Sequence, residues 1–368
     1  MSFLLTLIAF LLILGVLVFI HELGHFAVAK WMGMKVDEFA IGFPPRIWSK
    51  RKGETLYSLN AIPFGGYVKI HGETPESQDE DPRSFEQKSV WARMAVIVAG
   101  VTMNVLFAFV ILTVAFSVGF VSISQDLEQV PGATKRQTQV LVADIQEGGG
   151  ADKAGVKPGD LIKGFVSSED GAFTEVTTVA QLTAYTKTQQ ELGISTVKIS
   201  LNRNGELIET TAEIAKEGPP LGVYIQPFST VRVPVWQAPI VAVKEIGAII
   251  AVTWDALAGF WNKLFFSAQL DPNVSGPVGI YQATGSATQA GAISTIFLIV
   301  ALSLNLALLN ILPIPALDGG KLLFLIIEAI IGKKRMNRRL ESAITFAGFV
   351  MLIGLILILS VRDVIRLF

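Results

Sequence analysis

Long apolar runs separated by polar segments dominate this chain. Four runs are long enough to cross a bilayer, because about 20 helical residues span its ~30 Å of hydrocarbon. We predict membrane helices over about 3–29, 94–120, 292–312 and 341–361. From about 121 to 230, short runs typical of strands alternate with glycine, proline and charged turns, which predicts an inserted α+β domain.

The first run has an alternative interpretation as a secretory signal peptide. It lacks a basic n-region and a small-residue cleavage site before its polar cluster, so we expect a retained helix.

Basic residues sort the connections between the runs. Ten Lys and Arg lie between the first two runs, from Lys30 to Arg93, and five more lie in KKRMNRR over 333–339. The positive-inside rule therefore predicts that both connections face the cytoplasm. Both termini and the 121–290 region are then predicted to lie outside.

A fifth apolar stretch, about 238–266, carries Lys244, Glu245, Asp255 and Lys263. Charges within an apolar helix suit the membrane surface better than its interior. An odd number of crossings would also place one basic connection outside. We therefore predict an interfacial helix.

Composition agrees with membrane residence and limits the chemistry. Hydrophobic residues make up 51% of the chain and charged residues 17%, more apolar than a typical soluble domain. With 30 basic and 31 acidic residues, no nucleic-acid-binding surface is expected. Cysteine is absent, so a metal site must use His, Asp or Glu.

The sequence HELGH places His21, Glu22 and His25 near the end of the first run. Residues four apart lie on one face of a helix, so both imidazoles can bind one metal while Glu22 serves as general base. Ionisable groups at membrane depth mark functional sites. The alternative is that these side chains only hydrogen-bond neighbouring helices.

A catalytic Zn2+ needs a third protein ligand and an open position. The strongest candidate is Asp318 in NILPIPALDGG, where Pro313 and Pro315 must break the helix on the side predicted to be cytoplasmic. His71 is the remaining histidine. Its polar surroundings favour an exposed loop histidine over a ligand.

HELGH, IPFGGYVKIHGE, RMAVIVAGVTMN, SGPVGI and NILPIPALDGG together resemble the site-2 protease family, specifically its bacterial RseP-like branch with one PDZ domain. The resemblance implies His21, His25 and Asp318 as zinc ligands and Glu22 as catalytic base. The chain departs from the family pattern at Val101, where proline is common, and at Lys321, where histidine is common.

The resemblance also implies an activity and a substrate class. Members of the family are intramembrane zinc metalloproteases that perform regulated intramembrane proteolysis. Their substrates are single-span membrane proteins already cut on the outer side, such as anti-sigma factors, or remnant signal peptides. We expect the same here, in the bacterial inner membrane.

Residues 54–71 are interpreted as two short strands joined at Gly65 and Gly66. The resemblance implies a hairpin that dips into the membrane beside the zinc, with Gly65, Gly66 and Tyr67 against the substrate; the alternative is an ordinary cytoplasmic hairpin. The family also implies a substrate contact for Asn310, whereas an asparagine in a span can simply bond a neighbouring helix. Asn104 is given that helix-contact interpretation.

In the inserted domain, GADKAGVKPGDLI and PPLGVYIQ resemble parts of a permuted PDZ fold. Leu221, Gly222 and Val223 could then offer backbone N–H groups to a peptide terminus, and the domain could filter substrates. The alternative is a small β domain that only packs on the membrane part.

The predicted fold is a polytopic α-helical membrane protein with four transmembrane helices, a membrane-associated β-hairpin and an inserted extracytoplasmic PDZ-like α+β domain. The rival functions are a membrane metal transporter and a non-catalytic PDZ scaffold, neither of which needs Glu22.

The predicted segments are a first helix over 1–30, a cytoplasmic segment over 31–93, a second helix over 94–120, the PDZ-like domain over 121–230, an interfacial connector over 231–290, a third helix over 291–320, a basic cytoplasmic loop over 321–340, and a fourth helix with the C-terminus over 341–368.

Overall fold

The computed structural model forms two compact units, each described by itself. The helical unit comprises Ser2–Val110, Ile249–Gln282 and Ile299–Phe368, and the sheet unit comprises Ile111–Ala248 and Ala283–Leu298. The structure describes residues 3–73, 81–123, 130–135, 139–146, 148–167, 171–203, 206–216, 218–228, 230–267, 274–332 and 338–365.

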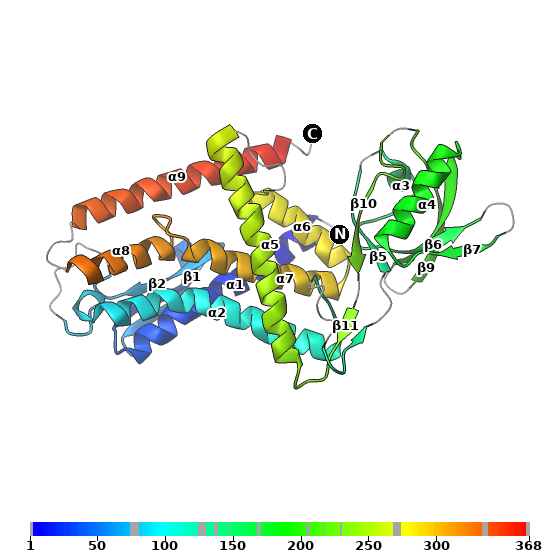
Figure 1. Ribbon diagram of the computed structural model, residues 1–368. Helices are drawn as coiled ribbons and strands as arrows, with labels where there is room; N and C mark the ends of the chain where they lie inside the picture. The colour runs from blue at the N-terminus through cyan, green and yellow to red at the C-terminus, as the bar shows by residue number, and fades with distance from the viewer. Residues whose placement is uncertain are drawn as a thin grey trace. The chain divides into compact units, whose positions relative to one another are not determined.

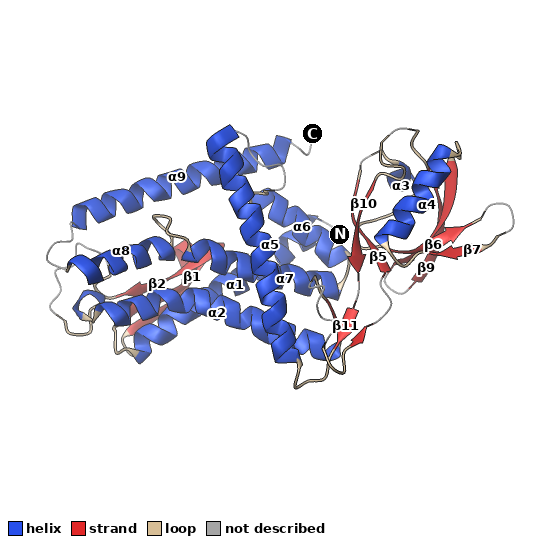
Figure 2. Ribbon diagram, in the orientation of Figure 1, coloured by secondary structure: helices blue, strands red, loops and turns tan. Residues whose placement is uncertain are grey.

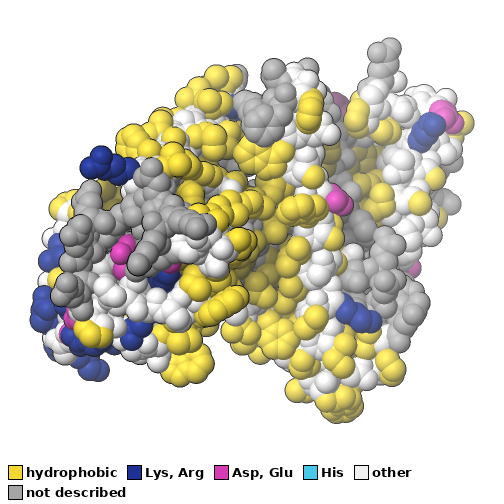
Figure 3. All heavy atoms as spheres, turned by 60° about the vertical axis from the view of Figure 1, so that its left-hand side comes forward, with side chains coloured by type: hydrophobic (Ala, Val, Ile, Leu, Met, Phe, Trp, Pro, Cys, Tyr) yellow, Lys and Arg dark blue, Asp and Glu magenta, His cyan; other side chains and the backbone are white. Residues whose placement is uncertain are grey.

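Four helices are long and apolar enough to cross a membrane within the described part of the chain. They are α1 (Phe3–Trp31), α2 (Val90–Val118), α7 (Ala292–Ile311) and α9 (Arg338–Ile365), labelled in Figure 1. They coincide with the four predicted runs. Large apolar side chains cover much of the surface, and Lys and Arg gather toward one end of the view in Figure 3, as expected for helices that face lipid.

The segment between α1 and α2 forms a larger sheet than predicted. Strands β1 (Val36–Lys52) and β2 (Thr55–Ile70) pair in an antiparallel hairpin. The strands also bend, so that residues 38–41 pair with two parts of β2, 56–59 and 66–69. This central segment therefore lies between two parts of the same strand.

The predicted turn at Gly65 and Gly66 is wrong, because both residues lie inside β2. The chain reverses at Gly53, whose φ of 62° is a left-handed conformation that glycine adopts readily. Glycine is needed at position 66 for a different reason, which is the lack of space for a side chain. A Cβ there would lie 2.9 Å from the carbonyl oxygen of Ala40 and 3.3 Å from Cγ of Glu22, so glycine allows the strand to approach α1.

The basic loop predicted over 321–340 begins instead as helix α8 (Asp318–Ile331). Its sequence, DGGKLLFLIIEAII, has an apolar face that packs through Leu325 into a buried cluster, which explains why it is helical. Residues 333–337, with Lys333, Lys334 and Arg335, lie outside the described residues. Between α7 and α8 the chain turns through Ala316, which has a positive φ of 78°.

A buried cluster joins α1, β2, α2 and α8 at one end of the helical unit. Its members include Ala29, Ile70, Phe85 and Leu325, and Phe85 belongs to the short 3-10 helix η1 (Phe85–Gln87). Burial of such side chains contributes roughly 1.5–3 kcal/mol each. The cluster fixes the ends of the elements that carry the site described below.

Helix α5 (Ala238–Ser267) is apolar but is not among the four candidate spans of the described residues. In the helical unit, Thr253 Oγ1 donates a hydrogen bond of 2.9 Å to Asn305 Oδ1 of α7, and Figure 1 draws α5 across α7. Its interfacial placement stays a prediction. Helix α6 (Pro277–Gln289) follows.

The larger sheet of the sheet unit has five strands in the order β10-β5-β6-β8-β9, and a sixth strand, β7, pairs with β6; Figure 2 shows the strands in red. Its core contains Phe165, Ile199 and Leu221. A second small sheet has the order β3-β11-β4. The bounds are β3 (Phe120–Val121), β4 (Thr134–Lys135), β5 (Gln139–Ile145), α3 (Gly150–Lys153), β6 (Leu161–Val166), β7 (Phe173–Glu175), α4 (Val179–Glu191), β8 (Thr196–Arg203), β9 (Glu206–Glu213), β10 (Val223–Phe228) and β11 (Thr230–Arg232).

Candidate metal centre

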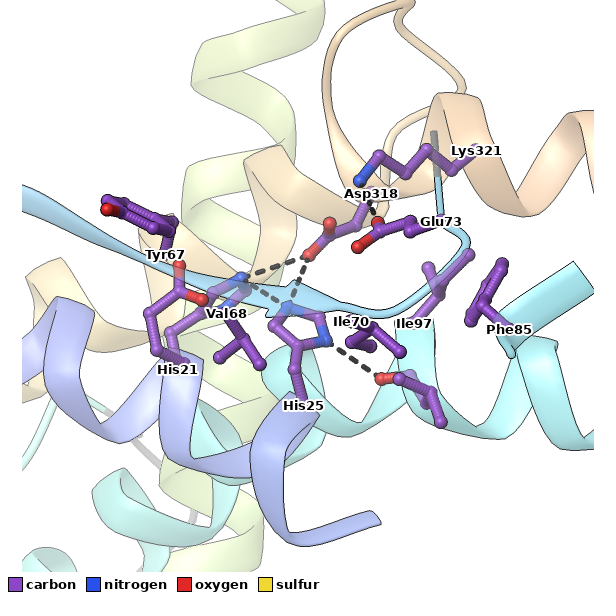
Figure 4. Close-up of a pocket in the computed structure, with 12 residues that line it drawn as sticks. His21, His25, Tyr67, Val68, Ile70, Glu73, Phe85, Ile97, Asp318 and Lys321 are labelled. Carbon is purple, nitrogen blue, oxygen red and sulfur yellow. Dashed lines mark hydrogen bonds and ion pairs between the residues drawn. The ribbon is translucent and has the colours of Figure 1, made fainter. Parts of the chain in front are cut away.

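Helix α1 presents two imidazoles on one face, as the HELGH spacing predicts. Nε2 of His21 and Nε2 of His25 lie 3.2 Å apart, and the rings are drawn in Figure 4. His21 is buried, with 6% of its surface exposed. Two neutral imidazoles whose Nε2 atoms converge in this way are a typical half of a zinc site.

Asp318 completes the group from 297 residues further along the chain. Its Oδ2 lies 2.9 Å from Nε2 of His21 and 3.2 Å from Nε2 of His25. In a tetrahedral zinc site with metal–ligand distances of about 2.0–2.1 Å, ligand atoms lie about 3.3 Å apart. The three side chains therefore fit Zn2+, and they form the one such group among the described residues.

The other imidazole nitrogens are held by α2. Nδ1–H of His25 donates to the carbonyl oxygen of Val96 at 2.8 Å, which leaves Nε2 free for a metal. Nδ1 of His21 lies 3.3 Å from the amide Nδ2 of Asn104, whose own Oδ1 is buried without a hydrogen-bond partner. A half-turn of this amide places Oδ1 as acceptor for an Nδ1–H of His21, the arrangement that outer partners of zinc-binding histidines adopt.

Asn104 thus bonds a neighbouring helix, as predicted, but the side chain it contacts is a candidate metal ligand. The sequence interpretation missed this role. Asn104 is completely buried, and its backbone carbonyl also accepts from Ser303 Oγ at 2.9 Å. The signal that could have indicated this role is the presence of a polar side chain in the middle of an apolar run.

Gly100 is a second site residue that sequence reasoning missed. A Cβ at this position would lie 2.7 Å from Cε1 of His25 and 2.8 Å from Cε1 of His21. No real side chain tolerates that distance, so glycine is required where α2 passes the imidazoles. On α1, Gly24 makes the matching approach, since its Cβ would lie 2.7 Å from Cγ of Met103.

The glycines after Asp318 allow α8 to begin close to the end of α7. A Cβ on Gly319 would collide with the carbonyl oxygens of Ile311 and Leu312, and one on Gly320 would lie 2.9 Å from the carbonyl carbon of Ile314. The motif LDGG therefore packs the first turn of α8 against the broken end of α7. This packing carries the carboxylate of Asp318 to the histidines.

A buried ion pair holds the same helix from its other end. The guanidinium of Arg93, at the start of α2, donates two hydrogen bonds to the carboxylate of Glu328 near the end of α8, one of them at 3.0 Å. Their side chains are 3% and 4% exposed. The pair fixes the position of α8, and hence of Asp318, relative to α2.

A pocket of about 170 Å³ adjoins the three candidate ligands. Glu22 lines it, beside Gly66 of β2. Across it, Lys321 Nζ donates to Glu73 Oε1 at 2.6 Å, and the charge of Glu73 raises the pKa of Lys321. The remaining lining residues are His21, His25, Tyr67, Val68, Ile70, Phe85, Val96, Ile97 and Asp318, and the lining residues are drawn in Figure 4.

The residues expected to contact substrate divide into two groups. Tyr67 lines the pocket, and the amide Nδ2 of Asn310 lies 3.4 Å from Nε2 of His21. Gly65, with φ of 98°, instead lies against the ring of Phe43. The β2 residues 66–69 pair with β1 on one side, and no strand pairs with their other side in the described part of the chain.

His71 is not the exposed loop histidine that was expected. It is half-buried, and its Nδ1 lies 3.0 Å from a carboxylate oxygen of Asp37. It does not belong to the group of candidate metal ligands found among the described residues. It ties the end of β2 to the beginning of β1.

The predicted peptide-terminus loop lies in the sheet unit. The Leu221 side chain is buried in the core, and the N–H of Gly222 donates to the carbonyl of Pro219 at 3.2 Å. Val223 begins β10, an edge strand of the sheet. The predicted link between a short helix and a strand in GADKAGVKPGDLI is confirmed by α3 and β6.

Comparison with known proteins identifies the family of this chain. The chain matches the model of peptidase family M50 over residues 9–355. A relative from Fusobacterium nucleatum is 33% identical, covering 99% of both chains. Regulator of sigma-W protease RasP of Bacillus subtilis and zinc metalloprotease RasP of Bacillus licheniformis are each 28% identical, also over 99% of both chains.

The family match spans nearly the whole chain, including both halves of the candidate metal centre. The resemblance seen in HELGH and LDGG is thereby confirmed at the level of the family. The chain belongs to peptidase family M50, the site-2 protease family, and is a zinc metalloprotease.

Proposed function

We propose that this protein is an intramembrane protease that hydrolyses peptide bonds in the membrane segments of single-span proteins. In this proposal His21, His25 and Asp318 hold Zn2+, and Glu22 is the catalytic base. The observation that carries it is the convergence of Nε2, Nε2 and Oδ2 from α1 and α8 within 3.2 Å of one another, at the end of an apolar helix.

Zinc supplies Lewis acidity when bound. Glu22, which lines the pocket and lies between the two histidines in sequence, accepts the proton of the attacking water and later gives it to the leaving amine. Asn104 and the Val96 carbonyl keep the two imidazoles oriented. The Asn310 amide, which lies 3.4 Å from His21, can bond a substrate peptide group once Nε2 of His21 is engaged by metal.

A helical substrate must unwind before its peptide carbonyls become accessible, since helix carbonyls are hydrogen-bonded within the helix. The β2 segment contributes Tyr67, Val68 and Ile70 to the lining of the pocket, and no described strand pairs with the side of residues 66–69 away from β1. Strand addition at this edge would hold the unwound chain with its backbone beside Glu22. Exposed apolar residues Ile47 and Ile62 on the same sheet favour contact with lipid.

The proposed location is the bacterial inner membrane, with both termini outside and the pocket near the cytoplasmic side. Lys30, Arg83 and Arg93 at the pocket end of the helical unit support this orientation. The name of the Bacillus subtilis relative, regulator of sigma-W protease, favours a role in regulated intramembrane proteolysis. The substrates would be anti-sigma factors or remnant signal peptides, shortened beforehand on the outer side.

For the sheet unit we propose a PDZ-like role in filtering substrates outside the membrane. The edge strand β10 can accept a peptide by strand addition, and α4 contacts it. The Gly222 N–H already donates to the Pro219 carbonyl. The proposed peptide site is therefore the edge of β10 and not the loop before it. A PDZ scaffold alone, or a metal transporter, would leave Glu22 without a use.

Substitution Glu22→Gln tests the proposed function. The variant should retain zinc but cleave a single-span reporter about 10²–10⁴-fold more slowly, the contribution of a general base. Zinc content and reporter cleavage are measured in the same detergent-purified sample. Glu54→Gln, which removes an exposed carboxylate paired with Lys30, is the control. Full cleavage by Glu22→Gln would contradict the proposal.

A further inference from the structure

A charged pair closes one side of the pocket without being part of the metal centre. Lys321 lies in the first turn of α8, and Glu73 lies three residues after β2; both line the pocket. Their side chains are 47% and 24% exposed, so the ion pair of 2.6 Å is in contact with solvent. Figure 4 shows the two side chains meeting beyond Asp318.

The position of Glu73 follows from the course of β2. Gly66 lies next to Glu22, and Ile70 packs with Ala29 near the end of α1, so the strand leads from the catalytic base toward the end of the helix. Glu73 continues this path. A substrate strand added along β2 advances about 3.3 Å per residue, so a residue roughly four to six positions from the cut bond reaches Glu73.

Two other described carboxylates of the segment between α1 and α2 pair with cations outside the pocket. Glu54 pairs with both Lys30 and Arg83, and Asp81 pairs with Arg83. None of these four residues lines the pocket. Among the described residues that line the pocket, Glu73 is the carboxylate that is neither a candidate metal ligand nor the proposed base, so it can meet a charge on a chain that leaves the pocket.

The exchange of one cation for another at Glu73 is energetically easy. Solvent-exposed ion pairs contribute little to stability, so Lys321 can release Glu73 at small cost. Single-span proteins carry Lys and Arg on their cytoplasmic flank, the side on which the pocket is proposed to lie.

We propose that Glu73 is a specificity-determining residue that binds a Lys or Arg on the cytoplasmic flank of the substrate, in exchange for Lys321. The inference rests on the proposed function and deepens it by naming a substrate feature. It assigns Lys321 the role of a resident counter-ion that holds the subsite when no substrate is bound.

The test uses three single-span reporters that differ only roughly four to six residues from the cut bond on its cytoplasmic side, where they carry Lys-Lys, Gln-Gln or Glu-Glu. The wild-type chain should prefer the Lys-Lys reporter over the Glu-Glu reporter by about fivefold, in keeping with an exposed ion pair. The reversed pair Glu73→Lys with Lys321→Glu keeps an ion pair and should prefer the Glu-Glu reporter. The single variant Glu73→Gln should cleave all three reporters at similar rates.

The matched control reverses Lys30 and Glu54, an ion pair of the same length at the same end that does not line the pocket. Its reporter ranking should equal that of the wild type. Binding is read independently of cleavage by photocrosslinking each reporter to the same variants carrying Glu22→Gln. An unchanged ranking in both Glu73 variants would overturn the subsite while leaving the proteolytic function intact. If zinc-loaded wild type cleaved none of the reporters, the proposed function itself would fail.

Discussion

Gly100 of α2 faces His25 of α1 so closely that a Cβ on the glycine would lie 2.7 Å from Cε1 of the imidazole. The contact places a backbone, rather than a side chain, behind the candidate zinc ligands. The space for two imidazoles therefore depends on a residue that carries no chemistry of its own.

We predict that Gly100→Ala abolishes zinc binding and cleavage, because the methyl group displaces both imidazoles. The measurement is zinc per purified chain together with reporter cleavage. The matched control is Gly15→Ala on α1, where a Cβ would meet nothing within 4 Å and alanine favours the helix. Equal zinc content in the two variants would contradict this role of Gly100.

Asn104→Ala should weaken zinc binding about 10–100-fold, the usual effect of removing an outer partner of a metal-binding histidine. The physical reason is that Nδ1 of His21 loses the amide 3.3 Å away. The measurement is zinc retention against a chelator series. Thr102→Ala, which removes an exposed hydroxyl of the same helix, should retain zinc like the wild type. Indistinguishable chelator curves for the two variants would show that Asn104 serves only packing.

The Arg93–Glu328 pair gives a prediction about stability. Arg93→Met or Glu328→Leu alone should lower stability by about 3–5 kcal/mol, since each leaves a buried charge without its partner. The double variant should recover most of the loss. Thermal unfolding in detergent measures the three proteins.

Lys153→Met is the comparison for that series, because its ion pair with Glu213 has side chains 59% and 60% exposed. Its melting temperature should stay near that of the wild type. Additive losses in the double variant would show that the Arg93 and Glu328 side chains do not act as a pair.

Excision of residues 122–229, which include the larger sheet of the sheet unit, tests the proposed filtering role. Val121 of β3 pairs with Thr230 of β11, so residues 122–229 can be replaced by a short glycine-serine linker that joins neighbouring ends. The shortened enzyme should cleave reporters with large outer domains that the full chain leaves intact. Western blotting of a reporter series measures this, and unchanged selectivity would favour a domain that only packs.

Much of the centre could be predicted from sequence because its signals are local. HELGH fixes the histidines on one helical face, whatever surrounds the helix. The four apolar runs needed only length and composition. Asp318 was predicted as the third candidate ligand because the helix break before it and the basic segment after it placed it on the same side as HELGH.

Gly100, Asn104 and the path of β2 could not be predicted in the same way, because their roles depend on contacts between distant segments. A glycine in an apolar run carries no sign of which helix it faces. Gly65 and Gly66 read as a turn, whereas Gly66 is needed for the approach of β2 to α1. Helix α8 was missed because Lys321 and the basic run after it suggested a loop.

The zinc content of the purified protein tests the central claim most directly. Elemental mass spectrometry should find one zinc per wild-type chain and almost none in Asp318→Ala, because the third ligand atom, 2.9 Å from His21 Nε2, is then missing. A full zinc complement in Asp318→Ala would contradict the proposed metal centre.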